Sequence, residues 1–146
     1  PRPEGPPMLF GTVQPRMMAC MAKYGDLWNA YYDDTHNKVD GIRRLRPIID
    51  EACRKEGRDP TTLERTVTVL VADSSADPWW DRLPTTNWQE EGPVKPLSGA
   101  DEIAETLLEY QAEGIAHIQV SIEPTNMQTI EAFVPVLEAV EKSATS

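Results

Sequence analysis

The sequence has few cysteines, a deficit of basic residues and no long apolar run. Two cysteines in 146 residues exclude a disulfide scaffold and favour a reducing compartment, the cytoplasm. Lys and Arg number 14 against 24 Asp and Glu, so the clustered cations that bind phosphate backbones are scarce and we expect no nucleic-acid binding. No apolar run approaches the roughly 20 residues of a membrane-spanning helix, so we expect no membrane segment.

Prolines divide the chain into segments. Residues 1–7 include four of the thirteen prolines and are predicted to be an extended linker, because proline disfavours helix in the residue before it. Residues 8–142 are predicted to form one domain, with residues 143–146 as a tail. An irregular insertion at residues 73–99 interrupts the domain, and an insertion of this length in a compact domain is usually a functional loop.

Apolar periodicity predicts four strands, each followed by a helix. The strands are expected at residues 8–10, 26–32, 66–72 and 117–122. The helices are expected at residues 16–24, 39–55, 99–113 and 127–142. This alternation predicts an α/β fold with a parallel sheet and right-handed crossovers.

The carboxyl ends of parallel strands are where functional residues gather. The first such end reads Gly11-Thr12-Val13-Gln14, followed by Pro15, which suits the first turn of a helix. A glycine lets a ligand approach the backbone, and free N–H groups at a helix start attract anions. The segment therefore suits the binding of an anion, with an ordinary strand-to-helix turn as the alternative.

Two further groups of residues lie at these strand ends. Asp33, Asp34 and His36 have metal-ligand chemistry, but no other ligand stands at a recognisable spacing, so we expect a solvated loop and no metal. Aromatic side chains in the long insertion indicate a ligand lid or a contact with another protein. They are Trp79, Trp80 and Trp88.

Three stretches of the chain carry a family resemblance. Residues 7–29 read PMLFGTVQPRMMACMAKYGDLWN, residues 45–69 read LRPIIDEACRKEGRDPTTLERTVTV, and residues 96–122 read PLSGADEIAETLLEYQAEGIAHIQVSI. Together they resemble the luciferase-like flavin-dependent monooxygenases. The resemblance spans nearly the whole chain apart from the tryptophan-containing insertion.

The resemblance implies a fold and a cofactor. Members of that family are (β/α)8 barrels that bind FMN or a deazaflavin at the carboxyl ends of their strands, and this chain resembles only their C-terminal four βα units. The expected fold is therefore half of a (β/α)8 TIM-type barrel. The resemblance further implies a cofactor phosphate held by Gly11, Thr12, Val13 and Gln14. It also implies a ring pocket lined by Trp28 and Asn29, with a core tryptophan and a capping asparagine as the alternative.

A half-barrel would have two open strand edges and, we expect, an exposed apolar inner sheet face, both unfavourable in water. We therefore expect either a homodimer or a complementary half-barrel chain to cover them. The corresponding loop of the family usually contains more glycine than residues 12–14 do here, which favours loss of the phosphate site. Trp28 and Asn29 match the family, which favours a surviving ring pocket.

Two functions follow as hypotheses, and the sequence leaves open whether the chain is itself an enzyme. The first is a flavin- or deazaflavin-binding component of an oxidoreductase with a small-molecule substrate, not active alone, because residues that catalyse would lie in the other half. The alternative is a non-catalytic binding or assembly protein that dimerises through its open sheet. A fragment of a longer chain is a third interpretation. No catalytic residue is identified.

Overall fold

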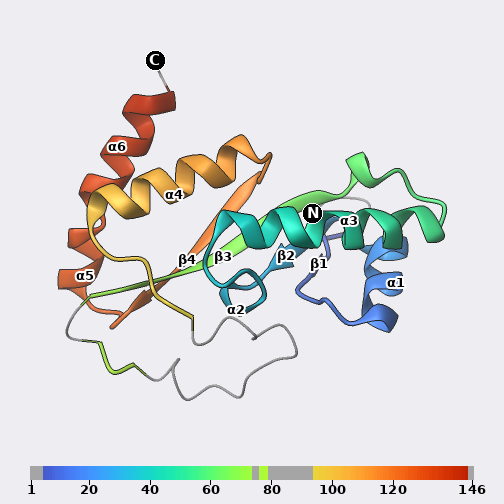
Figure 1. The fold of residues 1–146 in the computed structure, drawn as a ribbon, viewed down its shortest axis with the longest axis horizontal. Coiled ribbons are helices and arrows are strands. Elements are labelled where there is room, and N and C mark those ends of the chain that lie inside the picture. Colours follow the sequence, from blue (N-terminus) through green and yellow to red (C-terminus); the bar gives the residue numbers. More distant parts are fainter. Residues whose placement is uncertain (1–4, 74–75, 79–93, 145–146) are drawn as a thin grey trace.

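The strands form a single sheet in the order β1-β2-β3-β4, and all neighbouring strands are parallel, which confirms the predicted α/β fold (Figure 1). The computed structural model describes residues 5–73, 76–78 and 94–144. Each strand lies beside the one before it, as in consecutive βα units. The strands are β1 (Leu9–Phe10), β2 (Leu27–Ala30), β3 (Glu64–Ala72) and β4 (His117–Glu123).

Helices connect the strands and form a layer against the sheet. Helix α1 contacts α3, α3 contacts α4, and α4 contacts α6, so these four lie side by side. Helix α1 and the α5–α6 pair lie at opposite ends of the molecule (Figure 1). The helices are α1 (Pro15–Tyr24), α2 (Tyr32–Thr35), α3 (Val39–Lys55), α4 (Ala100–Ala112), α5 (Met127–Ala132) and α6 (Val134–Ala144), with a 3₁₀ turn at Pro60–Thr62.

The main core lies between the sheet and this helical layer. Strand β3 contributes Val67, Val69 and Val71, because alternate residues of a strand point to the same face. Helix α3 contributes a stripe that includes Ile42 and Ile49, each at most 1% exposed, as its apolar spacing predicts. Burying one such aliphatic side chain contributes about 1.5–3 kcal/mol, so this layer supplies much of the stability of the fold.

The opposite face of the sheet is polar over its middle, so the expectation of an apolar inner face is wrong there. Asn29 of β2 donates from Nδ2 to Thr68 Oγ1 of β3 at 3.0 Å, and Thr66 Oγ1 donates to Asn29 Oδ1 at 2.8 Å. Thr68 Oγ1 also donates to Gln119 Oε1 of β4 at 3.1 Å. The strand alternation that sends valines to the core sends these threonines to the inner face, where their hydrogen bonds connect three strands.

The strand predicted at residues 26–32 is shorter, and helix α2 occupies part of the predicted loop. Asp34 explains the change, because its Oδ2 accepts a hydrogen bond from the N–H of Tyr31 at 3.1 Å at the start of α2. Asp33 and Asp34 also place negative charge in the first helical turn, which the helix dipole favours. Tyr32, expected to end the strand, is instead buried as the first residue of α2.

The last predicted helix is divided into α5 and α6. Pro135 has no backbone N–H, and its ring crowds the carbonyl four residues earlier, so one regular helix does not continue through it. Beyond the break, Val136 of α6 is fully buried in the core. Ile130, Val134 and Leu137, which would share one face of an unbroken helix, are 46%, 48% and 51% exposed.

Asn37 holds three segments of the chain together. Its Nδ2 donates to the carbonyl oxygens of Leu70 at 2.8 Å and Lys95 at 3.0 Å, and its Oδ1 accepts from the N–H of Leu70 at 2.9 Å. The residue is buried and has φ of 60°, a left-handed conformation that asparagine adopts more readily than most residues. The loop between α2 and α3 is thereby fixed to the carboxyl end of β3.

Asn37→Ala is expected to lower the free energy of unfolding by roughly 2–4 kcal/mol, because it removes two buried hydrogen bonds and one partly buried one and strains the left-handed backbone. Urea unfolding at fixed pH measures the loss. Gln128→Ala, on the exposed first turn of α5, is the control and should stay within about 0.5 kcal/mol of the parent chain. A loss for Asn37→Ala no larger than that of the control would contradict the role assigned to Asn37.

Candidate functional site

Residues 11–14, here called the Gly11 loop, connect β1 to α1. The N–H of Gln14 donates to Thr12 Oγ1 at 3.1 Å, and the carbonyl oxygen of Gln14 accepts the first hydrogen bond within α1. The N–H groups of Arg16 and Met17 lie before that bond, so they have no acceptor inside the helix. The loop therefore presents hydroxyl, amide and backbone N–H donors near one helix end.

The Gly11 loop forms one wall of a cavity of about 600 Å³, here called the Gly11 cavity. Its opposite wall comes from the start of α2, which contributes Tyr31, Asp33 and Asp34. A Cβ placed on Gly11 would have the carbonyl oxygen of Asn29, 3.9 Å away, as its nearest non-neighbouring atom. The space beside Gly11 is therefore open to a ligand at the carboxyl ends of β1 and β2.

The α2 wall of the Gly11 cavity is acidic. Burial raises the pKa of Asp34, the hydrogen bond from the N–H of Tyr31 opposes that shift, and the nearby charge of Asp33 adds to it. Among the described residues that line the cavity, none is Lys, Arg or His. The cavity thus combines donors on the loop wall with carboxylate acceptors on the α2 wall.

Trp28 and Asn29 point to opposite faces of β2. The Trp28 side chain is fully buried in the core, and its Nε1 donates to the carbonyl oxygen of Thr12 at 2.8 Å, which anchors the Gly11 loop. The Asn29 side chain lies on the inner face, in the network with Thr66 and Thr68. The structure therefore brings Trp28 to the loop as its support within the core and not as a lining residue of the Gly11 cavity.

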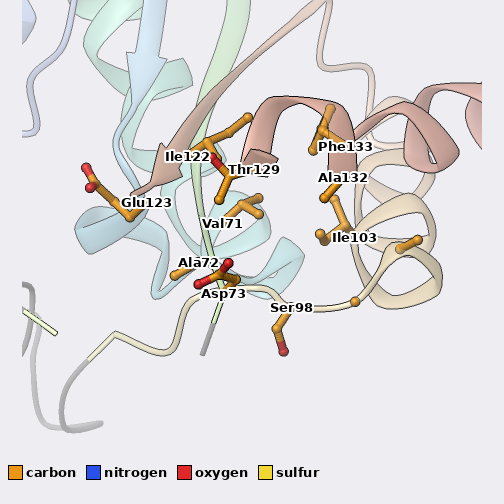
Figure 2. Close-up of a pocket in the computed structure, with 12 residues that line it drawn as sticks. Val71, Ala72, Asp73, Ser98, Ile103, Ile122, Glu123, Thr129, Ala132 and Phe133 are labelled. Atoms are coloured by element: carbon orange, nitrogen blue, oxygen red, sulfur yellow. The ribbon is translucent and has the colours of Figure 1, made fainter. Parts of the chain in front are cut away.

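A second cavity, of about 290 Å³, lies at the carboxyl ends of β3 and β4. Figure 2 shows side chains from both strands, from the start of α4 and from α5 around this space. Val71, Ile103 and Phe133 make much of it apolar, and Asp73 and Ser98 lie at one end (Figure 2). The sequence predicts functional residues at the carboxyl ends of the strands, but it does not identify these particular side chains.

The remaining candidate groups are placed as follows. Trp79, Trp80 and Trp88 lie outside the described residues. Within residues 5–73, 76–78 and 94–144, no three metal-ligating side chains lie close enough together to hold an ion. In the same part of the chain, no helix has the length and apolar character needed to cross a membrane.

Solved structures with a similar arrangement of strands and helices include F420-dependent enzymes and a monooxygenase, each about twice as long as this chain. EDTA monooxygenase from Chelativorans sp. BNC1 is 15% identical with a TM-score of 0.64, and the match covers 97% of this chain and 46% of that one. An F420-dependent secondary alcohol dehydrogenase is 18% identical with a TM-score of 0.60, over 93% of this chain and 49% of that one. The coenzyme F420-dependent tetrahydromethanopterin reductase from Methanopyrus kandleri is 12% identical with a TM-score of 0.61, over 94% and 50%.

The chain has the fold of half a luciferase-like barrel. This half-barrel spans about half the length of the solved structures that it matches. The likeness at these identities is one of fold, and it confirms the resemblance drawn from the sequence at that level. The sequence matches no protein-family model and no curated protein at a significant level.

Asp34→Asn is expected to stabilise the half-barrel at neutral pH. The pKa of Asp34 is raised above 3.8 in the folded chain, so the folded state favours the protonated acid. Protonation of Asp34 stabilises the folded state fully at pH values below the pKa of the unfolded chain. This contribution is lost as the pH rises through the pKa of the folded chain. The advantage of the neutral asparagine should therefore be present at pH 7 and shrink as the pH falls toward 3.8.

Thermal unfolding of parent and variant across this pH range measures the difference. Asp33→Asn, one residue earlier on the same wall, is the matched control for the loss of one negative charge. An equal advantage for Asp34→Asn at neutral and acidic pH would contradict a burial-raised pKa.

Proposed function

We propose that the half-barrel is a flavin- or deazaflavin-binding component of an oxidoreductase, with the cofactor's phosphate-bearing chain in the Gly11 cavity. The observation that supports this most directly is the placement of a donor-lined, glycine-containing loop at the start of α1 in this fold. The solved structures of the same fold include enzymes described as F420-dependent and as monooxygenases.

The donors of the Gly11 cavity fit a phosphorylated polyol chain. The Thr12 hydroxyl, the Gln14 amide and the N–H groups at the start of α1 can donate to phosphate oxygens. Asp33 and Asp34, on the opposite wall, can accept hydrogen bonds from hydroxyl groups. The open space beside Gly11 lets such a chain approach the backbone.

In this proposal the residues of the half-barrel bind and orient the cofactor. A bound flavin or deazaflavin supplies the redox chemistry, while the protein supplies position and electrostatics. Trp28 acts from the core by holding the Thr12 carbonyl, and so fixes the loop that carries the donors. Because the solved structures are about twice as long, we propose that the half-barrel is not active alone. Its free cysteines, Cys20 and Cys53, suit the reducing cytoplasm.

One observation favours the alternative, a non-catalytic binding or assembly protein. The described residues that line the Gly11 cavity include two carboxylates and no basic side chain, and carboxylates repel a phosphate dianion. A half-barrel that had lost its cofactor would keep the scaffold and the core without a need for cationic residues here. Direct binding measurements separate the two functions.

Titration with FMN, followed by flavin fluorescence, and a parallel titration with a deazaflavin test the proposed function. Saturable binding to the purified chain is expected, and Thr12→Val or Gln14→Leu should weaken it roughly tenfold by removing one hydrogen bond to a charged group. Added inorganic phosphate should compete.

Gln128→Leu removes the same side-chain amide on α5, away from the Gly11 cavity, and should leave the affinity unchanged. Saturable binding that is equally insensitive to Thr12→Val, Gln14→Leu and Gln128→Leu would place the cofactor elsewhere. The absence of saturable binding by either cofactor would favour the non-catalytic alternative.

A further inference from the structure

Exposed apolar side chains are concentrated at the two ends of the half-barrel. Nine large apolar residues are exposed in the described part of the chain, and all except Tyr31 lie at these ends. Four belong to the first edge, formed by β1 with its preceding residue and α1: Met8, Leu9, Met17 and Tyr24. Four belong to the last edge, formed by β4, α5 and α6: Met127, Ile130, Val134 and Leu137.

The sheet is also open at the same two edges. Among the described residues, β1 pairs only with β2, and β4 pairs only with β3 along its seven residues, His117–Glu123. The outer edge of β4 therefore presents backbone N–H and C=O groups without a neighbouring strand. Open strand edges of this kind are usually paired or covered in native proteins.

We propose that a second copy of this chain covers both edges, so that β4 of each copy pairs with β1 of the other. Four parallel strands in sequence order are half of an eight-stranded barrel, and a two-fold axis along the barrel keeps all eight strands parallel. That axis brings the first edge of each copy against the last edge of the other. The apolar residues of α5 and α6 are then covered by the partner's β1 and α1. This inference does not depend on cofactor binding.

The charges of the two edges are complementary. Helix α1 carries the basic residues Arg16 and Lys23, both exposed, and no acidic residue. Helices α5 and α6 carry three glutamates and one lysine, and Glu131 and Glu138 are exposed. Opposite charges favour the contact of a first edge with a last edge, whereas two like edges facing each other would repel.

The inner face of the sheet is already suited to a closed barrel. Asn29, Thr66, Thr68 and Gln119 hydrogen-bond to one another across three strands. Polar groups enclosed in a barrel interior must find partners within the protein, and these side chains have them. Closure by a second copy therefore leaves the side chains of this network with the partners they need.

Light scattering coupled to size exclusion tests the proposal on the whole 146-residue chain. The expected mass at micromolar concentration is twice the chain mass of 16.4 kDa. Leu137→Glu should raise the dissociation constant at least about tenfold, because it places a charge in the apolar centre of the last edge. Leu137 is half exposed in the single chain, so the variant should keep its circular dichroism spectrum.

Charge reversal distinguishes the proposed pairing from other dimers. Lys23→Glu alone and Glu138→Lys alone should each weaken the dimer, because each places like charges at both contacts. Mixing these two variants should restore dimers, since every contact in the mixed pair then joins opposite charges. A dimer that joins two first edges, or two last edges, would not be weakened by both variants and restored by mixing them.

Glu105→Lys, on the exposed face of α4, is the control for charge reversal and should leave the mass unchanged. A monomer at micromolar concentration would overturn the proposal. A dimer that is indifferent to Leu137→Glu, or that mixing fails to restore, would overturn it as well.

Discussion

The hydrogen bonds of Asn29 make the middle of the inner sheet face polar, and among the described residues the main layer of helices lies against the other face. Parallel sheets are normally covered on both faces and read as apolar throughout. Here Asn29 exchanges hydrogen bonds with Thr66 and Thr68, and Thr68 extends the network to Gln119. Asn29, Thr66 and Thr68 are buried in the single chain, and the hydrogen bonds among them satisfy their polar side chains.

Strand β2 links this network to the candidate site. Trp28 and Asn29 are consecutive, so they point to opposite faces, one into the core and the other onto the inner face. The indole N–H of Trp28 donates to the carbonyl oxygen of Thr12, which anchors the Gly11 loop to the buried core. A loop supported in this way presents its donors in one arrangement before any ligand arrives, which lowers the entropic cost of binding.

The fold could be predicted from the sequence because its signals are local and periodic. The apolar spacing of α3 and the β-branched run of β3 gave these elements almost to the residue. The departures arise where one side chain outweighs the pattern: Asp34 starts α2 at a predicted strand end, and Pro135 divides the last helix.

The position of residues 11–14 in the fold could be predicted from the sequence, but the side chains around them could not. The strand order placed residues 11–14 at a carboxyl end, and the structure finds a cavity there. The acidic wall from Asp33 and Asp34, and the bonds of Asn37 to Leu70 and Lys95, depend on contacts between distant parts of the chain. Periodicity carries no information on such contacts, so only the three-dimensional structure shows them.

Amide chemical shifts of the isotope-labelled chain, followed during addition of FMN, test the central claim most directly. If the Gly11 cavity is the cofactor site, the perturbed amides will cluster at residues 11–17 and at Asp33 and Asp34 on the opposite wall. Perturbations that centre on Val71 and Gly99, at the second cavity, or that never saturate at any residue, would contradict the account.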